Sequence, residues 1–89
     1  MQVRFTQSAR RHRIGRARAQ AVLAEPVRIV RAPGPAGREM WMYLGDDHTG
    51  RALEVGVLEE ADETLVVVHA MDLRAKYRQQ YERGKEERR

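Results

Sequence analysis

The chain offers few side chains that could act as a covalent nucleophile and many that could bind a phosphate. It contains one serine, Ser8, and no cysteine. Since Ser8 lies at the start of a predicted helix, where a hydroxyl caps free amides, covalent catalysis by serine or cysteine is nearly excluded. No glycine-rich phosphate-binding loop is present. Arginine, by contrast, supplies 15 of the 17 basic residues. The composition therefore favours a reaction in which the substrate brings its own nucleophile.

Cleavage of RNA by its own 2′-hydroxyl is a reaction of this kind. The protein must supply a base for the hydroxyl proton, an acid for the 5′-oxygen and cations for the charge on the phosphorane. Histidine suits the first two roles, whereas arginine is too basic to be the base and suits the third. Asp46, Asp47 and His48 could contact a cation, but an acidic turn explains them more simply. We therefore predict a ribonuclease with no metal site and no cofactor.

His69 is the strongest candidate for the acid or base. It lies near the end of residues 64–71, a segment that is apolar on both faces and is therefore predicted to be the central, most buried strand. By alternation His69 shares a face with Leu65, Val67 and Met71, so a hydrogen-bonded core histidine is equally compatible with the sequence.

A helix predicted to follow His69 carries the remaining catalytic candidates. Arg74 and Arg78 form one helical stripe that could clamp a phosphate, although a solvated helix face has the same spacing. Tyr81 belongs to the neighbouring stripe, which is typical of packing against a sheet, and its hydroxyl could reach solvent at the edge of that contact.

The densest basic run in the chain is Arg10-Arg11-His12-Arg13, and we expect these four residues to bind RNA phosphates rather than form only a surface turn. Charge is also divided along the chain, with +8 over residues 1–38, −7 over 39–71 and +3 over 72–89. Such a division indicates a basic footprint for nucleic acid, although ordinary solvated faces would give the same count. The alternative function is therefore a non-catalytic protein that binds nucleic acid or an acidic partner through its basic N-terminal helices.

The elements that must position these residues are predicted from periodicity and from turn signals. A short extended start over residues 3–5 precedes two helices, and Gly15 separates them. Four strands and a last helix ending at Gly84 follow, the strands being joined by short turns that favour an antiparallel meander. The helices are expected over residues 6–13, 16–24 and 72–83, and the strands over residues 27–31, 39–44, 52–58 and 64–71. The predicted fold class is α+β, with two N-terminal helices, a four-stranded antiparallel sheet and a C-terminal helix.

The same segments resemble a known family, the BrnT-type toxins of the RelE-like ribonuclease superfamily. The similar motifs are Phe5…Ala9…Arg13-Ile14-Gly15, Val22-Leu23-Ala24-Glu25-Pro26, Gly50-Arg51-Ala52-Leu53-Glu54-Val55, and Leu65-Val66-Val67-Val68-His69-Ala70-Met71 before a basic helix that contains Tyr81. The usual Trp-Asp start is absent, and His69-Ala70-Met71 stands where the family has Ser-Ala-Arg.

The resemblance implies a cytoplasmic endoribonuclease toxin of a type II toxin–antitoxin module. Residues 1–84 would form one RelE-like domain and residues 85–89 a charged tail. The implied partners are RNA and a small DNA-binding antitoxin that covers the basic face, in a toxin–antitoxin hetero-oligomer. A homodimer through the apolar sheet edge remains an alternative.

Overall fold

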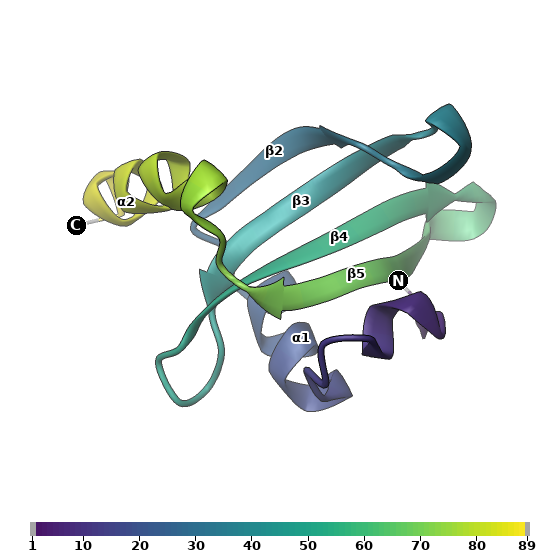
Figure 1. Ribbon diagram of the computed structural model, residues 1–89, viewed down its shortest axis with the longest axis horizontal. Coiled ribbons are helices and arrows are strands. Elements are labelled where there is room, and N and C mark those ends of the chain that lie inside the picture. The colour runs from purple at the N-terminus through teal and green to yellow at the C-terminus, as the bar shows by residue number, and fades with distance from the viewer. Residues whose placement is uncertain (1, 89) are drawn as a thin grey trace.

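The computed structural model describes residues 2–88 as a curled sheet with one helix beneath it and another at its end (Figure 1). The strands are β1 (Gln2–Phe5), β2 (Arg28–Pro33), β3 (Glu39–Asp46), β4 (Ala52–Glu60) and β5 (Thr64–Asp72). The helices are α1 (Arg16–Ala24) and α2 (Arg78–Glu87), with single 3₁₀ turns at Ser8–Arg10, Pro35–Gly37, Ala61–Glu63 and Ala75–Tyr77. Within the described chain, no helix has the length and apolar character needed to cross a membrane.

The sheet has five strands in the order β1-β5-β4-β3-β2, and it is mixed because β1 runs parallel to β5. The predicted four-stranded antiparallel sheet is therefore wrong, and so is the first of the two N-terminal helices. Strand β1 occupies the extended start predicted over residues 3–5, but the local sequence could not reveal that it joins the sheet, because it pairs with a strand about sixty positions further along the chain.

Hydroxyl groups hold the segment after β1 against the edge of β5. The Thr6 hydroxyl donates to the carbonyl of Val67, and the Ser8 hydroxyl donates to the carbonyl of Val68, each at 3.0 Å. These bonds satisfy edge carbonyls that a continuous helix over residues 6–13 would leave unpaired. Only the 3₁₀ turn Ser8–Arg10 forms there.

Helix α1 occupies the predicted residues and covers one face of the sheet. Ala19 and Val22 are fully buried beneath it. A Cβ at Gly45 would lie 3.3 Å from the Val22 side chain and 3.4 Å from the Glu25 carbonyl, so the bare backbone of β3 lets α1 pack closely.

Strand β4 is the centre of the sheet, with every residue from Leu53 to Leu58 buried. The prediction gave this place to residues 64–71, which form the neighbouring strand. One apolar cluster lies on the α1 side and includes Leu53, Val55 and Val57. The opposite face carries a second cluster around Met42 and Leu44, to which α2 contributes Tyr81.

The last helix begins later and ends later than the sequence predicts. Strand β5 continues to Asp72, a 3₁₀ turn follows, and α2 runs from Arg78 to Glu87. Gly84 lies inside α2 and is buried against Val27. A Cβ at this position would collide with the carbonyl group of Val27. Gly84 therefore permits a close contact between α2 and the start of β2 instead of ending the helix.

Candidate active site

A β-bulge in β5 decides which face of the sheet carries His69. Val57 pairs with Val67, but Gly56 pairs with His69, so Val68 is an extra residue in β5. The bulge reverses the alternation, and His69 lies on the face opposite to that of Leu65 and Val67. The face predicted for His69 is therefore wrong, and the imidazole is directed away from the α1-side core.

Gly56 leaves the space that His69 occupies. A Cβ at Gly56 would lie 3.1 Å from the Cβ of His69 and 2.7 Å from the sulfur of Met40. Real Cβ atoms essentially never lie 2.7 Å from another atom, so a side chain at this position would force the Met40 side chain to move and would press on the Cβ of His69.

Glu54 is the centre of the candidate site, a residue to which the sequence analysis assigned no role. Its carboxylate is fully buried on β4 and lies 2.8 Å from Nε2 of His69. It also accepts two hydrogen bonds from Arg74, from the backbone amide and from Nε, each at 2.8 Å, and Nη2 of the same guanidinium forms an ion pair with it at 2.6 Å. Burial by itself would raise the pKa of Glu54, but the hydrogen bonds from His69 and Arg74 outweigh it and hold the pKa below its usual value.

The charge on Glu54 fixes the tautomer of His69. An ionised carboxylate only accepts hydrogen bonds, so we assign a proton to Nε2 of His69. The other ring nitrogen, Nδ1, makes no hydrogen bond within residues 2–88. The His69 side chain is 22% exposed, so Nδ1 belongs to a ring that solvent and a substrate can reach. This arrangement holds the ring by one nitrogen and leaves the other for proton transfer.

The N-terminal basic run meets this cluster. The rings of His12 and His69 lie 6.1 Å apart, measured between centroids, in an edge-to-face arrangement. Arg10, Arg11 and Arg13 are exposed in the same segment. The structure thus brings the predicted RNA-binding run and the predicted catalytic histidine together, because the hydroxyl bonds described above hold that segment on β5.

Arg74 does not lie on a helical stripe with Arg78 as predicted, because its backbone is extended and precedes the 3₁₀ turn Ala75–Tyr77. Its role as a phosphate clamp stays a prediction. Its side chain is 40% exposed, and its Nη1 nitrogen makes no hydrogen bond among the described residues. The guanidinium lies 5.6 Å from the ring centroid of Tyr77. Burial and the charge of Glu54 raise the pKa of Tyr77, so this phenol stays neutral beneath the cation.

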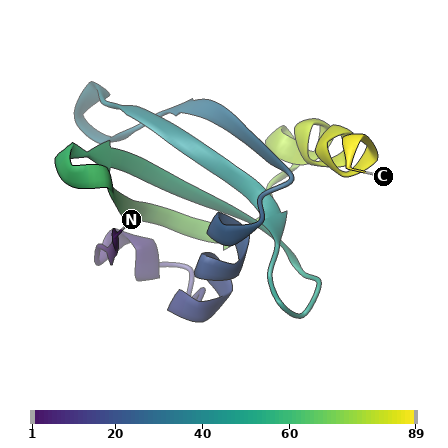
Figure 2. The ribbon, with the colours of Figure 1, turned by 180° about the vertical axis from the view of Figure 1, so that it is seen from behind.

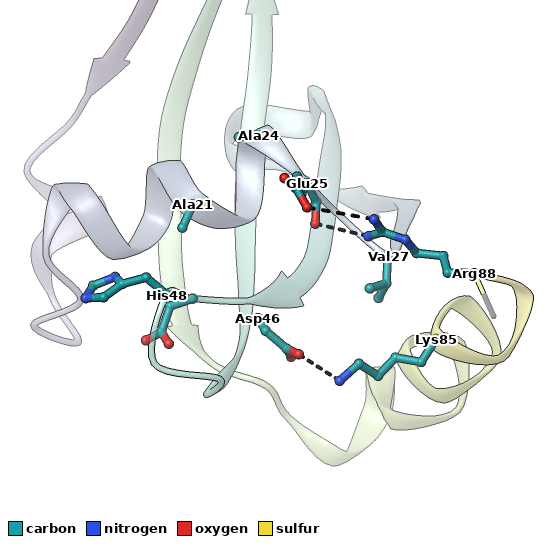
Figure 3. A pocket seen from close by; sticks show the side chains of 9 residues that line it. Ala21, Ala24, Glu25, Val27, Asp46, His48, Lys85 and Arg88 are labelled. Atoms are coloured by element: carbon teal, nitrogen blue, oxygen red, sulfur yellow. Dashed lines mark hydrogen bonds and ion pairs between the residues drawn. The ribbon is translucent and has the colours of Figure 1, made fainter.

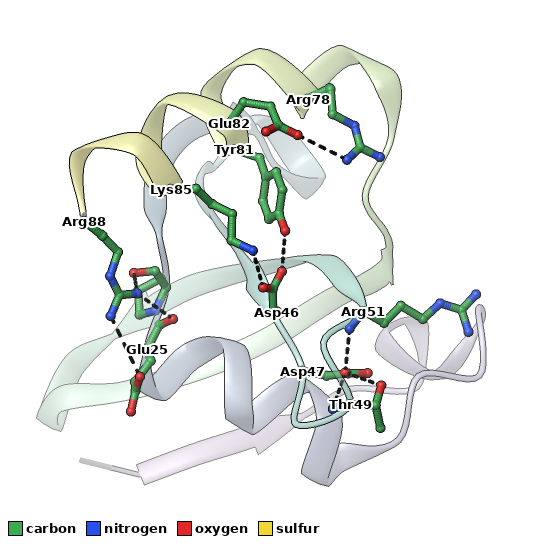
Figure 4. Close-up of polar contacts among 11 residues, drawn as sticks. Glu25, Asp46, Asp47, Thr49, Arg51, Arg78, Tyr81, Glu82, Lys85 and Arg88 are labelled. Carbon is green, nitrogen blue, oxygen red and sulfur yellow. Dashed lines mark hydrogen bonds and ion pairs between the residues drawn. The ribbon is translucent and has the colours of Figure 1, made fainter.

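The structure does not bring Tyr81 and Arg78 into this cluster. Tyr81 is 6% exposed and its hydroxyl donates to Asp46 at 2.5 Å, while Lys85 reaches the same carboxylate at 2.7 Å (Figure 4). Arg78 pairs with Glu82 at 3.6 Å, and its guanidinium lies 5.7 Å from the centre of the Tyr81 ring. The Tyr81 and Lys85 contacts attach α2 to the end of β3, whereas Arg78 interacts only with residues of its own helix.

The acidic turn between β3 and β4 is structural as well. The Asp47 carboxylate is buried and accepts hydrogen bonds from Arg18 at 2.7 Å and from the hydroxyl of Thr49 at 2.7 Å. Backbone amides of Thr49 and Arg51 add two more. The hydrogen bonds from Thr49 and Arg18 hold the pKa of Asp47 well below its usual range. Over residues 2–88, no three His, Asp or Glu side chains gather to hold a metal ion.

A pocket of about 510 Å³ lies elsewhere, between α1, the β3–β4 turn and α2 (Figure 3). Both of its cations are already engaged, Lys85 with Asp46 and Arg88 with the backbone carbonyls of Glu25 and Pro26. None of the residues around His69 lines it. Pocket size therefore does not point to the cluster that the chemistry selects.

Comparison of the chain with protein-family models and with curated proteins gives no match. The functional argument therefore depends on the geometry around Glu54, His69 and Arg74.

Proposed function

We propose that the protein is a metal-independent endoribonuclease whose active site consists of His69, His12, Arg74 and Glu54. One observation carries the proposal. A fully buried carboxylate holds an imidazole by one nitrogen, and that imidazole lies beside a second imidazole and a partly exposed arginine. These groups supply a base, an acid and a cation within one cluster, as cleavage by the 2′-hydroxyl requires.

The reaction would use the two imidazoles in complementary protonation states. One accepts the proton of the 2′-hydroxyl while the 2′-oxygen forms a bond to phosphorus. The bond from phosphorus to the 5′-oxygen breaks, and the second imidazole, protonated, donates to that leaving oxygen. The products are a 2′,3′-cyclic phosphate and a 5′-hydroxyl. Nη1 of Arg74 would donate to a non-bridging phosphoryl oxygen, where charge increases in the transition state.

Glu54 would act through His69 and Arg74 and not on the substrate, since its side chain has no exposed surface. It keeps the proton on Nε2 of His69 and fixes the direction of the Arg74 guanidinium. Glu54 is therefore a positioning residue.

The surroundings of the cluster suit a polyanion. Arg10, Arg11 and Arg13 would contact successive phosphates on the His12 side, and such contacts carry little information about base sequence. We extend the proposal to a cytoplasmic toxin that a small DNA-binding antitoxin inhibits. The resemblance to BrnT-type toxins supports this cellular role.

The test is RNA turnover by purified protein in the presence of EDTA. We expect His69→Ala and Arg74→Ala each to reduce cleavage by about 100-fold or more, because each removes a group that acts on the reacting atoms. The matched controls are His48→Ala and Arg83→Ala, which change exposed residues away from the cluster and should cleave like the wild type. In cells, the wild type and both control variants should arrest growth, and His69→Ala and Arg74→Ala should not. RNA binding without turnover would contradict the proposal and would favour the non-catalytic alternative.

A further inference from the structure

Part of the sheet on the α1 side has no helix across it. Figure 2 shows α1 beneath one end of the sheet, where it packs on β3 and β4, and the N-terminal segment along β5, whereas β2 and the other end of β3 have no helix across them. Ile29 on β2 is 43% exposed, which no other large hydrophobic residue among residues 2–88 equals. It pairs across the strands with Tyr43, and the neighbouring Trp41 is also only partly buried. These three side chains form an apolar surface that the chain itself leaves partly uncovered.

Carboxylates surround this surface. Tyr43 lines a hollow of about 240 Å³ together with Glu59, Glu60 and Glu63. Burial raises the pKa of Tyr43, and the negative charge of Glu59 raises it further, so the carboxylate acts directly on the phenol. Two of the nearby carboxylates are paired, Glu39 with Arg31 at 2.9 Å and Glu60 with Arg38 at 3.4 Å. Glu59 and Glu63 form no ion pair within the described residues, so this surface is locally negative on a protein whose net charge is +4.

We propose that Ile29, Trp41, Tyr43 and the carboxylates around them, here called the aromatic–acidic surface, bind a basic amphipathic helix of a partner protein. The apolar stripe of that helix would cover Ile29, Trp41 and Tyr43. Its lysines and arginines would pair with Glu59 and Glu63, for which no ion pair is formed within the described chain.

Charge excludes the competing occupants. Nucleic acid would meet the carboxylates with its own negative charge. A second copy of the chain in a two-fold dimer would place the same carboxylates against each other, which is unfavourable. His69 lies on the other face of the sheet, so a partner bound here leaves the candidate active site open. The inference therefore stands independently of the proposed nuclease activity.

The experiment uses Trp41, the only tryptophan of the chain, as a reporter within the surface. The probe is an 18-residue helical peptide of leucine and lysine with one apolar stripe, and its counterpart carries glutamate in place of lysine. We expect the lysine peptide to produce a saturable change in Trp41 fluorescence that weakens at high salt, and the glutamate peptide to produce none. Glu59→Lys with Glu63→Lys should weaken binding about tenfold.

The matched control is Glu82→Lys with Glu86→Lys on the exposed side of α2, which should bind the lysine peptide like the wild type. An unchanged Trp41 signal, equal binding of both peptides, or equal loss in the control would overturn the proposal. Sedimentation that shows a dimer, lost in Ile29→Asp, would assign the surface to a second copy instead and would overturn it as well.

Discussion

Replacing Glu54 by glutamine tests the buried carboxylate on which the candidate site is built. The amide has nearly the same shape but no charge, and it presents an NH₂ group where one carboxylate oxygen stood. Because both oxygens of Glu54 accept hydrogen bonds, from His69 and from Arg74, either orientation of the amide places a donor against a donor.

The magnitude follows from burial. Breaking a buried charge pair costs about 3–5 kcal/mol when the remaining charge stays buried. The Arg74 side chain is 40% exposed and can recover part of its hydration, so we expect a loss of about 2–4 kcal/mol. A chain of 89 residues has a total stability of about 4–13 kcal/mol. The melting temperature should therefore fall by about 10–25 °C.

Urea unfolding followed by circular dichroism and by Trp41 fluorescence measures this loss. Glu82→Gln is the matched control, since it removes an exposed pair of 3.6 Å and should change stability by less than about 0.5 kcal/mol. If Glu54→Gln is as stable as this control, the buried carboxylate does not anchor His69 and Arg74, and the account of the site is wrong.

The pH dependence of the same difference gives an independent check. The pKa of Glu54 is lower in the folded protein than in the unfolded chain, so its ionised form stabilises the fold. That contribution is complete above the unfolded pKa of about 4.3 and is lost as the pH falls through the folded pKa. The difference in free energy of unfolding between wild type and Glu54→Gln should thus be constant at neutral pH and should become smaller in acid. A difference in free energy of unfolding that grew in acid would contradict a lowered pKa of Glu54 in the folded protein.

Three further predictions concern the supports of the site. Gly56→Ala should cost about 1–3 kcal/mol and reduce RNA cleavage by the folded protein, because its Cβ collides with Met40 and presses on His69. Gly15→Ala has open space around it and changes only the N-cap of α1, so paired unfolding and cleavage assays should show a cost below about 1 kcal/mol and unchanged cleavage. Tyr81→Phe should lower stability by about 1–2 kcal/mol in urea and leave cleavage unchanged; a loss of cleavage in fully folded protein would return Tyr81 to the active site. Arg10→Ala with Arg11→Ala should weaken RNA binding and reduce the dependence of affinity on salt, and an unchanged salt slope would remove the run from the RNA interface.

Local sequence patterns were sufficient to predict the helices and strands that are flanked by glycine, proline or turn residues. Helix α1 lies where its alanine-rich segment between Gly15 and Pro26 predicts it, and strands β2 to β5 lie within a few residues of their predicted ranges. Residues 3–5 were predicted to be extended, but the pairing of β1 with β5 was missed because the partner strand is distant in sequence. The end of α2 was misplaced because Gly84 serves a close contact with Val27, and a glycine near a helix end usually indicates termination.

Some features of the candidate site could likewise be predicted from the sequence, and others could not. His69, Arg74 and His12 were identified by residue type, and the structure brings these three together. Glu54 left one signal in the sequence, a carboxylate between Leu53 and Val55 in an otherwise apolar strand, since a buried charge needs partners. The bulge at Val68 left none, because an extra residue in one strand is defined only by the strand beside it.

The most direct measurement compares an RNA oligonucleotide with the same sequence fully 2′-O-methylated, in EDTA, with identification of the product ends. The account predicts that the RNA is cut to fragments with 2′,3′-cyclic phosphate and 5′-hydroxyl ends, that the methylated strand remains intact, and that His69→Ala cuts neither. Cleavage of the methylated strand, or a 5′-phosphate on the products, would show that the 2′-hydroxyl is not the nucleophile and would contradict the account.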